Sequence, residues 1–98
     1  MAKIDAKQAA DLVKGLPGWA LDGAAIRRQF EFAGFPDAVA FVVRLGFAAE
    51  AADHHPDLLI SYKRVTATYS THSEGGLTEK DFEGARVASG IAASLGAR

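Results

Sequence analysis

The sequence predicts an α+β domain in which helices pack on one face of an antiparallel sheet, with the element order αββαββα. Residues 5–14, 36–53 and 78–96 have helical spacing or helix-capping residues, and the β-rich runs between them come in two closely spaced pairs. Because each pair can form a hairpin, the sheet is expected to be antiparallel. The chain has 98 residues, which is the size of one small domain, so we expect a single domain over residues 1–98.

The first helix is predicted over residues 5–14. Apolar residues between positions 9 and 13 follow the three-to-four spacing of a helix face. Asp5 is a favourable N-cap, and the glycine that follows Lys14 is expected to end the helix.

A first hairpin is predicted from Trp19–Leu21 and Ala25–Phe32. Asp22-Gly23 between them is the kind of dipeptide that favours a tight turn with positive φ. In the second strand, apolar and polar residues alternate with a period of two, so one face should be buried. Arg28 lies on this apolar face and therefore needs a polar partner there.

The longest helix is predicted from Pro36 to Asp53. A proline in the first turn and Asp37 near the positive end of the helix dipole are typical of a helix start. Between Ala38 and Ala49 the only charged residue is Arg44. A helix that is apolar nearly all round is buried on more than one side. We therefore expect one side to pack on the domain's own sheet and another to contact a second subunit.

A second hairpin is predicted from Leu58–Tyr62 and Val65–Thr71, with its turn at Lys63-Arg64. This dipeptide lacks the asparagine or glycine that a two-residue turn usually needs. If the second strand continues, His72 lies on the same face as its threonines; otherwise the strand ends before His72.

The last helix is predicted to begin at Thr78 and to end near Gly96. Thr78 and Asp81 have the spacing of a capping box, in which each side chain bonds to the backbone N–H of the other residue. Small or apolar residues recur along one side of this helix: Phe82, Ala85, Ser89 and Ala92.

The composition is that of an ordinary globular protein, with 49% hydrophobic residues, 23% charged residues and a net charge of −1. Scattered basic residues argue against a nucleic-acid-binding or membrane-surface protein. The absence of cysteine excludes disulfides, a thiol nucleophile and thiolate metal ligands. The N-terminus lacks the apolar stretch of a signal peptide, and the longest apolar run, residues 38–43, is too short to span a bilayer. We therefore expect a cytoplasmic protein without a nucleic-acid or membrane partner.

Candidate catalytic residues are concentrated around the end of the long helix. Histidine is the side chain that most readily exchanges protons near neutral pH, and two of the three histidines are adjacent here. Pro56 disfavours helical geometry in the preceding residue, so the helix should stop near His54. Glu50 lies one helical turn before His54, and the two are expected to pair. The candidate site residues are Glu50, Asp53, His54, His55, His72 and Asp81.

Each candidate also has a purely structural explanation. Histidine is common at helix C-termini, Asp81 could serve only in the capping box, and His72 could be a solvent-facing strand residue. Three histidines and two carboxylates could alternatively bind zinc or iron. Adjacent histidines are a poor bidentate pair compared with histidines three or four residues apart on a helix, so we expect no metal. The sequence contains no nucleophile-elbow motif, and Gly75-Gly76 is too short for a phosphate-binding loop.

The spacing of seven residues resembles the signature of the pterin-4a-carbinolamine dehydratase family. These residues are Glu50, His54, His55, Pro56, Tyr62, His72 and Asp81. The surrounding segments are also similar to that family: Ser70-Thr71-His72 before a loop, Gly75–Thr78 at the start of the last helix, and Trp19–Leu21 before the strand at 26–32. The resemblance covers essentially the whole chain after the first helix.

The resemblance implies a four-stranded antiparallel sheet backed by helices, in homodimers or homotetramers. It also implies a hydro-lyase, 4a-hydroxytetrahydrobiopterin dehydratase, which removes water from a 4a-hydroxytetrahydropterin to give the quinonoid dihydropterin. This step recycles the tetrahydrobiopterin cofactor of aromatic amino-acid hydroxylases. The pterin is the substrate, and no metal, redox cofactor or covalent intermediate is expected.

The resemblance further implies a role for each candidate residue. His54 and His72 are expected to donate or accept protons on the two faces of the pterin, and His55 to bind and orient it. Glu50 and Asp53 are expected to hold the histidines, while Asp81 completes the site and caps its helix.

Two positions depart from the family pattern. Several members have an aromatic residue where this chain has Leu58, and often asparagine where it has Lys63.

The alternative function is a non-catalytic one, because the family includes dimerisation cofactors of a transcription factor and relatives linked to enzyme assembly. Three histidines at this spacing favour the enzyme.

Overall fold

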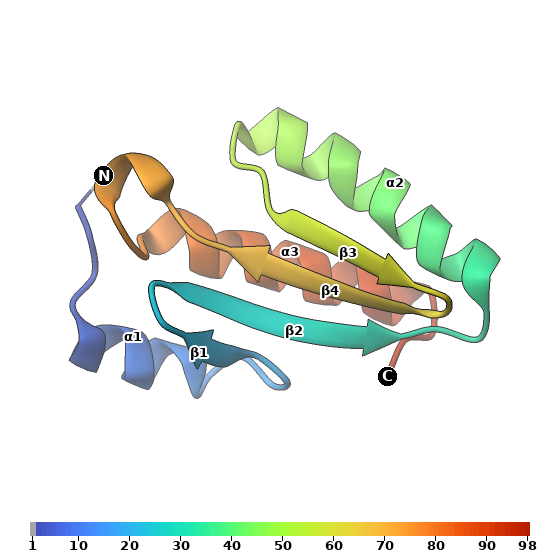
Figure 1. Ribbon diagram of the computed structural model, residues 1–98, viewed down its shortest axis with the longest axis horizontal. Coiled ribbons are helices and arrows are strands. Elements are labelled where there is room, and N and C mark those ends of the chain that lie inside the picture. Colours follow the sequence, from blue (N-terminus) through green and yellow to red (C-terminus); the bar gives the residue numbers. More distant parts are fainter. Residues whose placement is uncertain (1) are drawn as a thin grey trace.

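The computed structural model describes residues 2–98; Met1, which the predicted domain includes, lies outside the described residues. A four-stranded sheet has the order β1-β2-β4-β3, with every neighbouring pair antiparallel. Helix α3 lies behind the sheet, α2 runs along its β3 side, and α1 lies beside β1 (Figure 1). The predicted α+β class and element order are confirmed. The elements are α1 Ala6–Val13, β1 Ala20–Asp22, β2 Ala25–Glu31, α2 Phe35–Ala52, β3 Asp57–Ser61, β4 Arg64–Tyr69, the 3₁₀ helix η1 His72–Glu74, and α3 Glu79–Ser94.

The core lies between the sheet and the two long helices, because the central strands alternate buried and exposed side chains. The rings of Phe30 on β2 and Phe41 on α2 pack with their centroids 5.0 Å apart. Helices α2 and α3 contribute to one continuous core cluster together with β2 and β4. Its fully buried members include Ile26, Phe30, Phe41, Leu45, Val65, Ala67, Phe82 and Ala85.

The first hairpin turn lies one residue later than predicted. Asp22 pairs with Ala25, so the turn residues are Gly23 and Ala24 rather than Asp22-Gly23. Gly23 has φ +60°, which glycine adopts without steric cost. Trp19 precedes β1 and is not part of it; its indole Nε1 donates to Ser89 Oγ of α3 at 2.8 Å.

Arg28 has the partners that its position on the buried face requires. Its guanidinium donates to the Pro17 carbonyl at 3.0 Å and to Ser89 Oγ at 3.3 Å, and it lies 4.4 Å from the centroid of the Phe30 ring. Gly18 leaves the room that this arrangement needs, because a Cβ there would lie 2.7 Å from Arg28 Nε.

The second hairpin turn lies one residue earlier than predicted. Ser61 pairs with Arg64, so the turn residues are Tyr62 and Lys63 rather than Lys63-Arg64. Tyr62 adopts the left-handed conformation, with φ +53°. The register keeps Val65 on the buried face, and a shift by one residue would turn it to solvent.

The helix ends agree closely with the sequence. Asp5 caps α1 together with Gln8, and Thr78 and Asp81 form the capping box of α3, as predicted for both N-caps. Helix α2 ends at Ala52, one residue before the predicted end, and its C-cap Asp53 has φ +52°. Within residues 2–98, no helix has the length and apolar character needed to cross a bilayer.

Candidate active site

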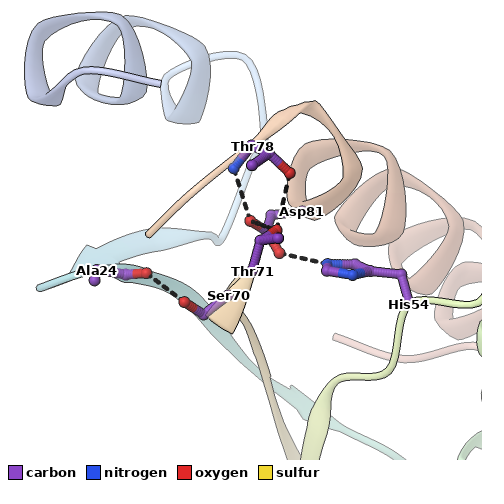
Figure 2. Close-up of polar contacts among 6 residues, drawn as sticks. All are labelled: Ala24, His54, Ser70, Thr71, Thr78 and Asp81. Carbon is purple, nitrogen blue, oxygen red and sulfur yellow. Dashed lines mark hydrogen bonds and ion pairs between the residues drawn. The ribbon is translucent and has the colours of Figure 1, made fainter. Parts of the chain in front are cut away.

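The candidate site lies where the end of α2, the end of β4 and the start of α3 meet at one end of the sheet (Figures 1 and 2). His54 follows the last turn of α2, and Asp81 lies in the first turn of α3. Asp53 turns the chain out of the helix in a left-handed conformation, which only a minority of non-glycine residues adopt. This turn directs His54 towards α3 and leaves His55 on the α2 side.

His54 and Asp81 form the central pair of the site. Nε2 of His54 lies 2.6 Å from Oδ1 of Asp81, whose side chain is fully buried, and the His54 side chain is only 13% exposed. The imidazole ring stacks on the Tyr69 ring at a centroid distance of 5.8 Å. Burial and, second, the negative charge of Asp81 raise the pKa of the Tyr69 phenol to about 12. Tyr69 is therefore an uncharged wall of the site at neutral pH.

The expected pairing of Glu50 with His54 is wrong. Glu50 Oε1 lies 2.7 Å from Nε2 of His55 instead. The helix ends at Ala52, so the one-turn relationship does not extend to residue 54. Both side chains of the Glu50–His55 pair are more than half exposed, so water screens their attraction.

Two threonines that were not predicted as site residues bind the buried carboxylate. Asp81 Oδ2 accepts hydrogen bonds from the Thr78 backbone N–H and from Thr71 Oγ1, both at 2.9 Å, and the two threonine hydroxyls lie 2.8 Å apart (Figure 2). The sequence placed Thr71 at the end of a strand and Thr78 at a helix cap. Only the proximity of these two segments in the fold shows that they share Asp81.

His72 and Asp53 stand apart from these contacts. Strand β4 ends at Tyr69, and exposed His72 begins η1, so the alternative in which the strand ends first is correct. In the described part of the chain, neither His72 nor Asp53 has a side-chain hydrogen bond or ion pair. Residues 2–98 also contain no group of three or more His, Cys, Asp or Glu side chains that could hold a metal ion.

A cavity of about 270 Å³ opens beside His54, between α2 and α3. Its wall is mostly apolar, which is the usual character of a small-molecule site. The ionisable groups in the wall are His54, Tyr69, Lys80 and Glu83. A larger cavity, of about 560 Å³, lies between α1 and the β1–β2 turn, and its lining contains none of the three histidines. The chemistry therefore favours the smaller cavity as the candidate site.

The family model described as pterin 4 alpha carbinolamine dehydratase matches residues 2–91. The chain belongs to this family. The resemblance seen in the sequence is thereby confirmed, and the buried histidine–aspartate pair lies within the matched region.

Relatives with curated names support the same assignment. A protein of Roseiflexus sp. (strain RS-1), provisionally named pterin-4-alpha-carbinolamine dehydratase, is 52% identical over 68 residues, which are 69% of this chain and 73% of the relative. A protein of Chloroflexus aurantiacus with the same provisional name is 46% identical over 82 residues, which are 84% of this chain and 88% of the relative.

Two solved structures have a similar fold. A transcriptional coactivator/pterin dehydratase from Brucella melitensis superposes with a TM-score of 0.87 at 38% identity, covering 92% of this chain and 98% of that one. A pterin dehydratase-like protein identified as a RuBisCO assembly factor in the α-carboxysome has a TM-score of 0.64 at 19% identity, covering 76% of this chain and 86% of that one. The second comparison bears on the fold alone.

Proposed function

We propose that the protein catalyses the dehydration of a 4a-hydroxytetrahydropterin to the quinonoid dihydropterin, in the recycling of tetrahydrobiopterin in the cytoplasm. The observation that carries this proposal is the His54–Asp81 pair beside a mostly apolar cavity. A histidine held by a buried carboxylate is a common arrangement for moving a proton to or from a bound substrate. Membership of the dehydratase family supplies the substrate class.

The reaction needs two proton movements and nothing else. One proton goes to the 4a-hydroxyl group, which leaves as water, and the proton on the neighbouring ring nitrogen is removed. His54 and His72 are the proposed groups for these movements, and general acid–base catalysis of this kind accelerates a reaction roughly 10²–10⁴-fold. The exposed His55–Glu50 pair is proposed to bind and orient the pterin, with Asp53 beside it. The pterin is the substrate, so the proposal involves no cofactor or metal.

The test is the rate of quinonoid dihydropterin formation from chemically prepared 4a-hydroxytetrahydropterin. We expect the wild type to accelerate the reaction well above buffer, and His54→Ala to lose at least tenfold in rate. Equal melting temperatures of the two proteins would show that the loss is chemical. A wild-type rate equal to that of buffer would reject the dehydratase proposal.

A second candidate function, as a dimerising or assembly protein, is favoured by the outer face of α2. Phe47 is 76% exposed and Val43 51% exposed, and Leu59 on the neighbouring edge strand β3 is 66% exposed. Exposed apolar side chains beside an open strand edge are typical of a surface that another chain covers. We propose that a second copy of this chain binds there, giving the homodimer or homotetramer expected from the sequence.

A further inference from the structure

We propose that Thr71 is a positioning residue: with Thr78 it orients the Asp81 carboxylate, which holds His54 as the tautomer protonated on Nε2 and leaves Nδ1 to exchange protons with the substrate. The catalytic part of this inference rests on the proposed function. The tautomer itself does not, because it follows from hydrogen bonds within the chain.

The direction of the hydrogen bonds follows from counting hydrogens. A carboxylate only accepts, and a threonine hydroxyl has one hydrogen to donate. Because the hydrogen of Thr71 Oγ1 goes to Asp81 Oδ2, the bond between the two hydroxyls requires Thr78 Oγ1 to donate to Thr71 Oγ1. The Thr78 backbone N–H supplies a further donor to Oδ2. The donors thus converge on Oδ2 and leave Oδ1 directed at His54 (Figure 2).

Burial makes this arrangement rigid. Asp81 and Thr78 are fully buried and Thr71 is 8% exposed, so water has little access to replace a lost bond. The carboxylate also lies at the N-terminal end of α3, where the helix dipole favours negative charge. The negative charge of Asp81 is one cause of the raised pKa of Tyr69, second to burial.

The backbone around Thr71 is held independently of its side chain. Thr71 exchanges two backbone hydrogen bonds with Gly76, at 3.0 and 3.3 Å. The preceding residue, Ser70, donates its hydroxyl hydrogen to the Ala24 carbonyl at 2.7 Å, which ties the end of β4 to the β1–β2 turn (Figure 2). Removing only the Thr71 hydroxyl should therefore leave the chain in place and release the carboxylate.

The bond to Asp81 determines which nitrogen of His54 can react. Nε2 is 2.6 Å from an acceptor and therefore carries a hydrogen. Every buried side-chain nitrogen and oxygen in the described residues has a partner. Nδ1 of His54 has no hydrogen bond within residues 2–98, so it is accessible from outside the protein. Since His54 lines the cavity, Nδ1 is the nitrogen available to a bound pterin.

Nitrogen-15 spectra of the imidazole rings test the tautomer without any substrate. At a pH where His54 is neutral, we expect Nε2 to give the signal of a protonated nitrogen, with a slowly exchanging downfield proton, and Nδ1 that of an unprotonated one. His54→Gln identifies the signals by their loss. A wild-type spectrum with the proton on Nδ1 would overturn the inference, whatever the behaviour of the variants.

Thr71→Val tests the positioning role, because valine keeps the shape and removes the hydroxyl. We expect it to shift His54 towards a mixture of tautomers, to speed exchange of the Nε2 proton and to lower kcat about tenfold with little change in KM. Thr71→Ser should restore both signals and rate. Thr68→Val, on the opposite face of β4, is the matched control and should change neither.

The two proposals fail in different ways. If the nitrogen-15 spectrum of Thr71→Val were identical to that of the wild type, the positioning role would be rejected even if the wild type is an active dehydratase. A wild type with the expected tautomer but no dehydratase activity would reject the proposed function and leave the hydrogen-bond assignment supported.

Discussion

Nε2 of His54 lies 2.6 Å from Oδ1 of Asp81, although 27 positions separate the two residues in the chain. His54 follows the last turn of α2 and Asp81 lies in the first turn of α3, so the pair joins the two helices that cover the core. The same contact is both a structural link and the centre of the candidate site.

Asp81→Asn should impair both stability and activity. An amide cannot replace the carboxylate as an acceptor for all three donors, and losing a buried charged acceptor costs about 1.5–3 kcal/mol in unfolding free energy. The dehydration rate should fall at least tenfold. Urea unfolding and the dehydration assay measure the two effects. Asp11→Asn, at an exposed ion pair with Lys14, is the control that should leave both unchanged.

His72→Ala should reduce turnover without affecting folding. His72 is exposed on η1, so its removal should leave the melting temperature within error. As a proposed proton donor or acceptor, it should account for at least a tenfold decrease in kcat. His55→Ala should instead raise KM more than it lowers kcat. An unchanged kcat in His72→Ala would remove His72 from the proposed mechanism.

Gly84→Ala should destabilise the protein although alanine favours helices. A Cβ at Gly84 would lie 2.5 Å from Cε1 of Tyr69, so the ring that stacks on His54 would have to move. Gly90→Ala, in the same helix but with nothing within 4 Å of the added Cβ, should stabilise by up to about 1 kcal/mol. Urea unfolding of the two variants side by side gives the comparison. If both variants were equally stabilised, the Tyr69 ring would be able to move away from the added Cβ at no cost in stability, and the prediction would be wrong.

Tyr69 should make the fold sensitive to alkali. Burial, and then Asp81, raise its pKa from 10 to about 12 in the folded protein. Because the pKa is raised, the folded state retains the phenol proton at a pH where the unfolded state loses it. The contribution of Tyr69 to the free energy of unfolding is therefore complete below pH 10 and is lost as the pH rises towards 12. Tyr69→Phe should lose less stability than the wild type over this range. Exposed Tyr62→Phe should behave like the wild type.

Phe47→Glu tests the proposed contact between copies. Phe47 is 76% exposed on α2, and a carboxylate there would be costly to bury against a second chain. Light scattering at micromolar concentration should show an oligomer for the wild type and a smaller species for the variant. Gln29→Glu, at an exposed position of β2, adds the same single negative charge and is the control. A monomeric wild type would contradict the proposal.

The local elements could be predicted because their signals are local. The caps at Asp5 and Thr78 each depend on residues within one helical turn, and both are confirmed. The alternation of β2 follows from a period of two in neighbouring residues. Both hairpin turns were misplaced by one residue, because the pairing between strands sets the register and turn preferences alone do not.

The sequence by itself determined the order of elements, the family resemblance and the identity of the ionisable residues. Only the tertiary structure decided which of them meet: Glu50 binds His55, His54 binds Asp81, and Thr71 was not recognised as a partner of that carboxylate. The physical reason is that a buried carboxylate must find its donors among whatever segments pack around it. Those donors come from the segment after β4, the N-cap of α3 and the segment after α2, and their proximity is a property of the assembled core.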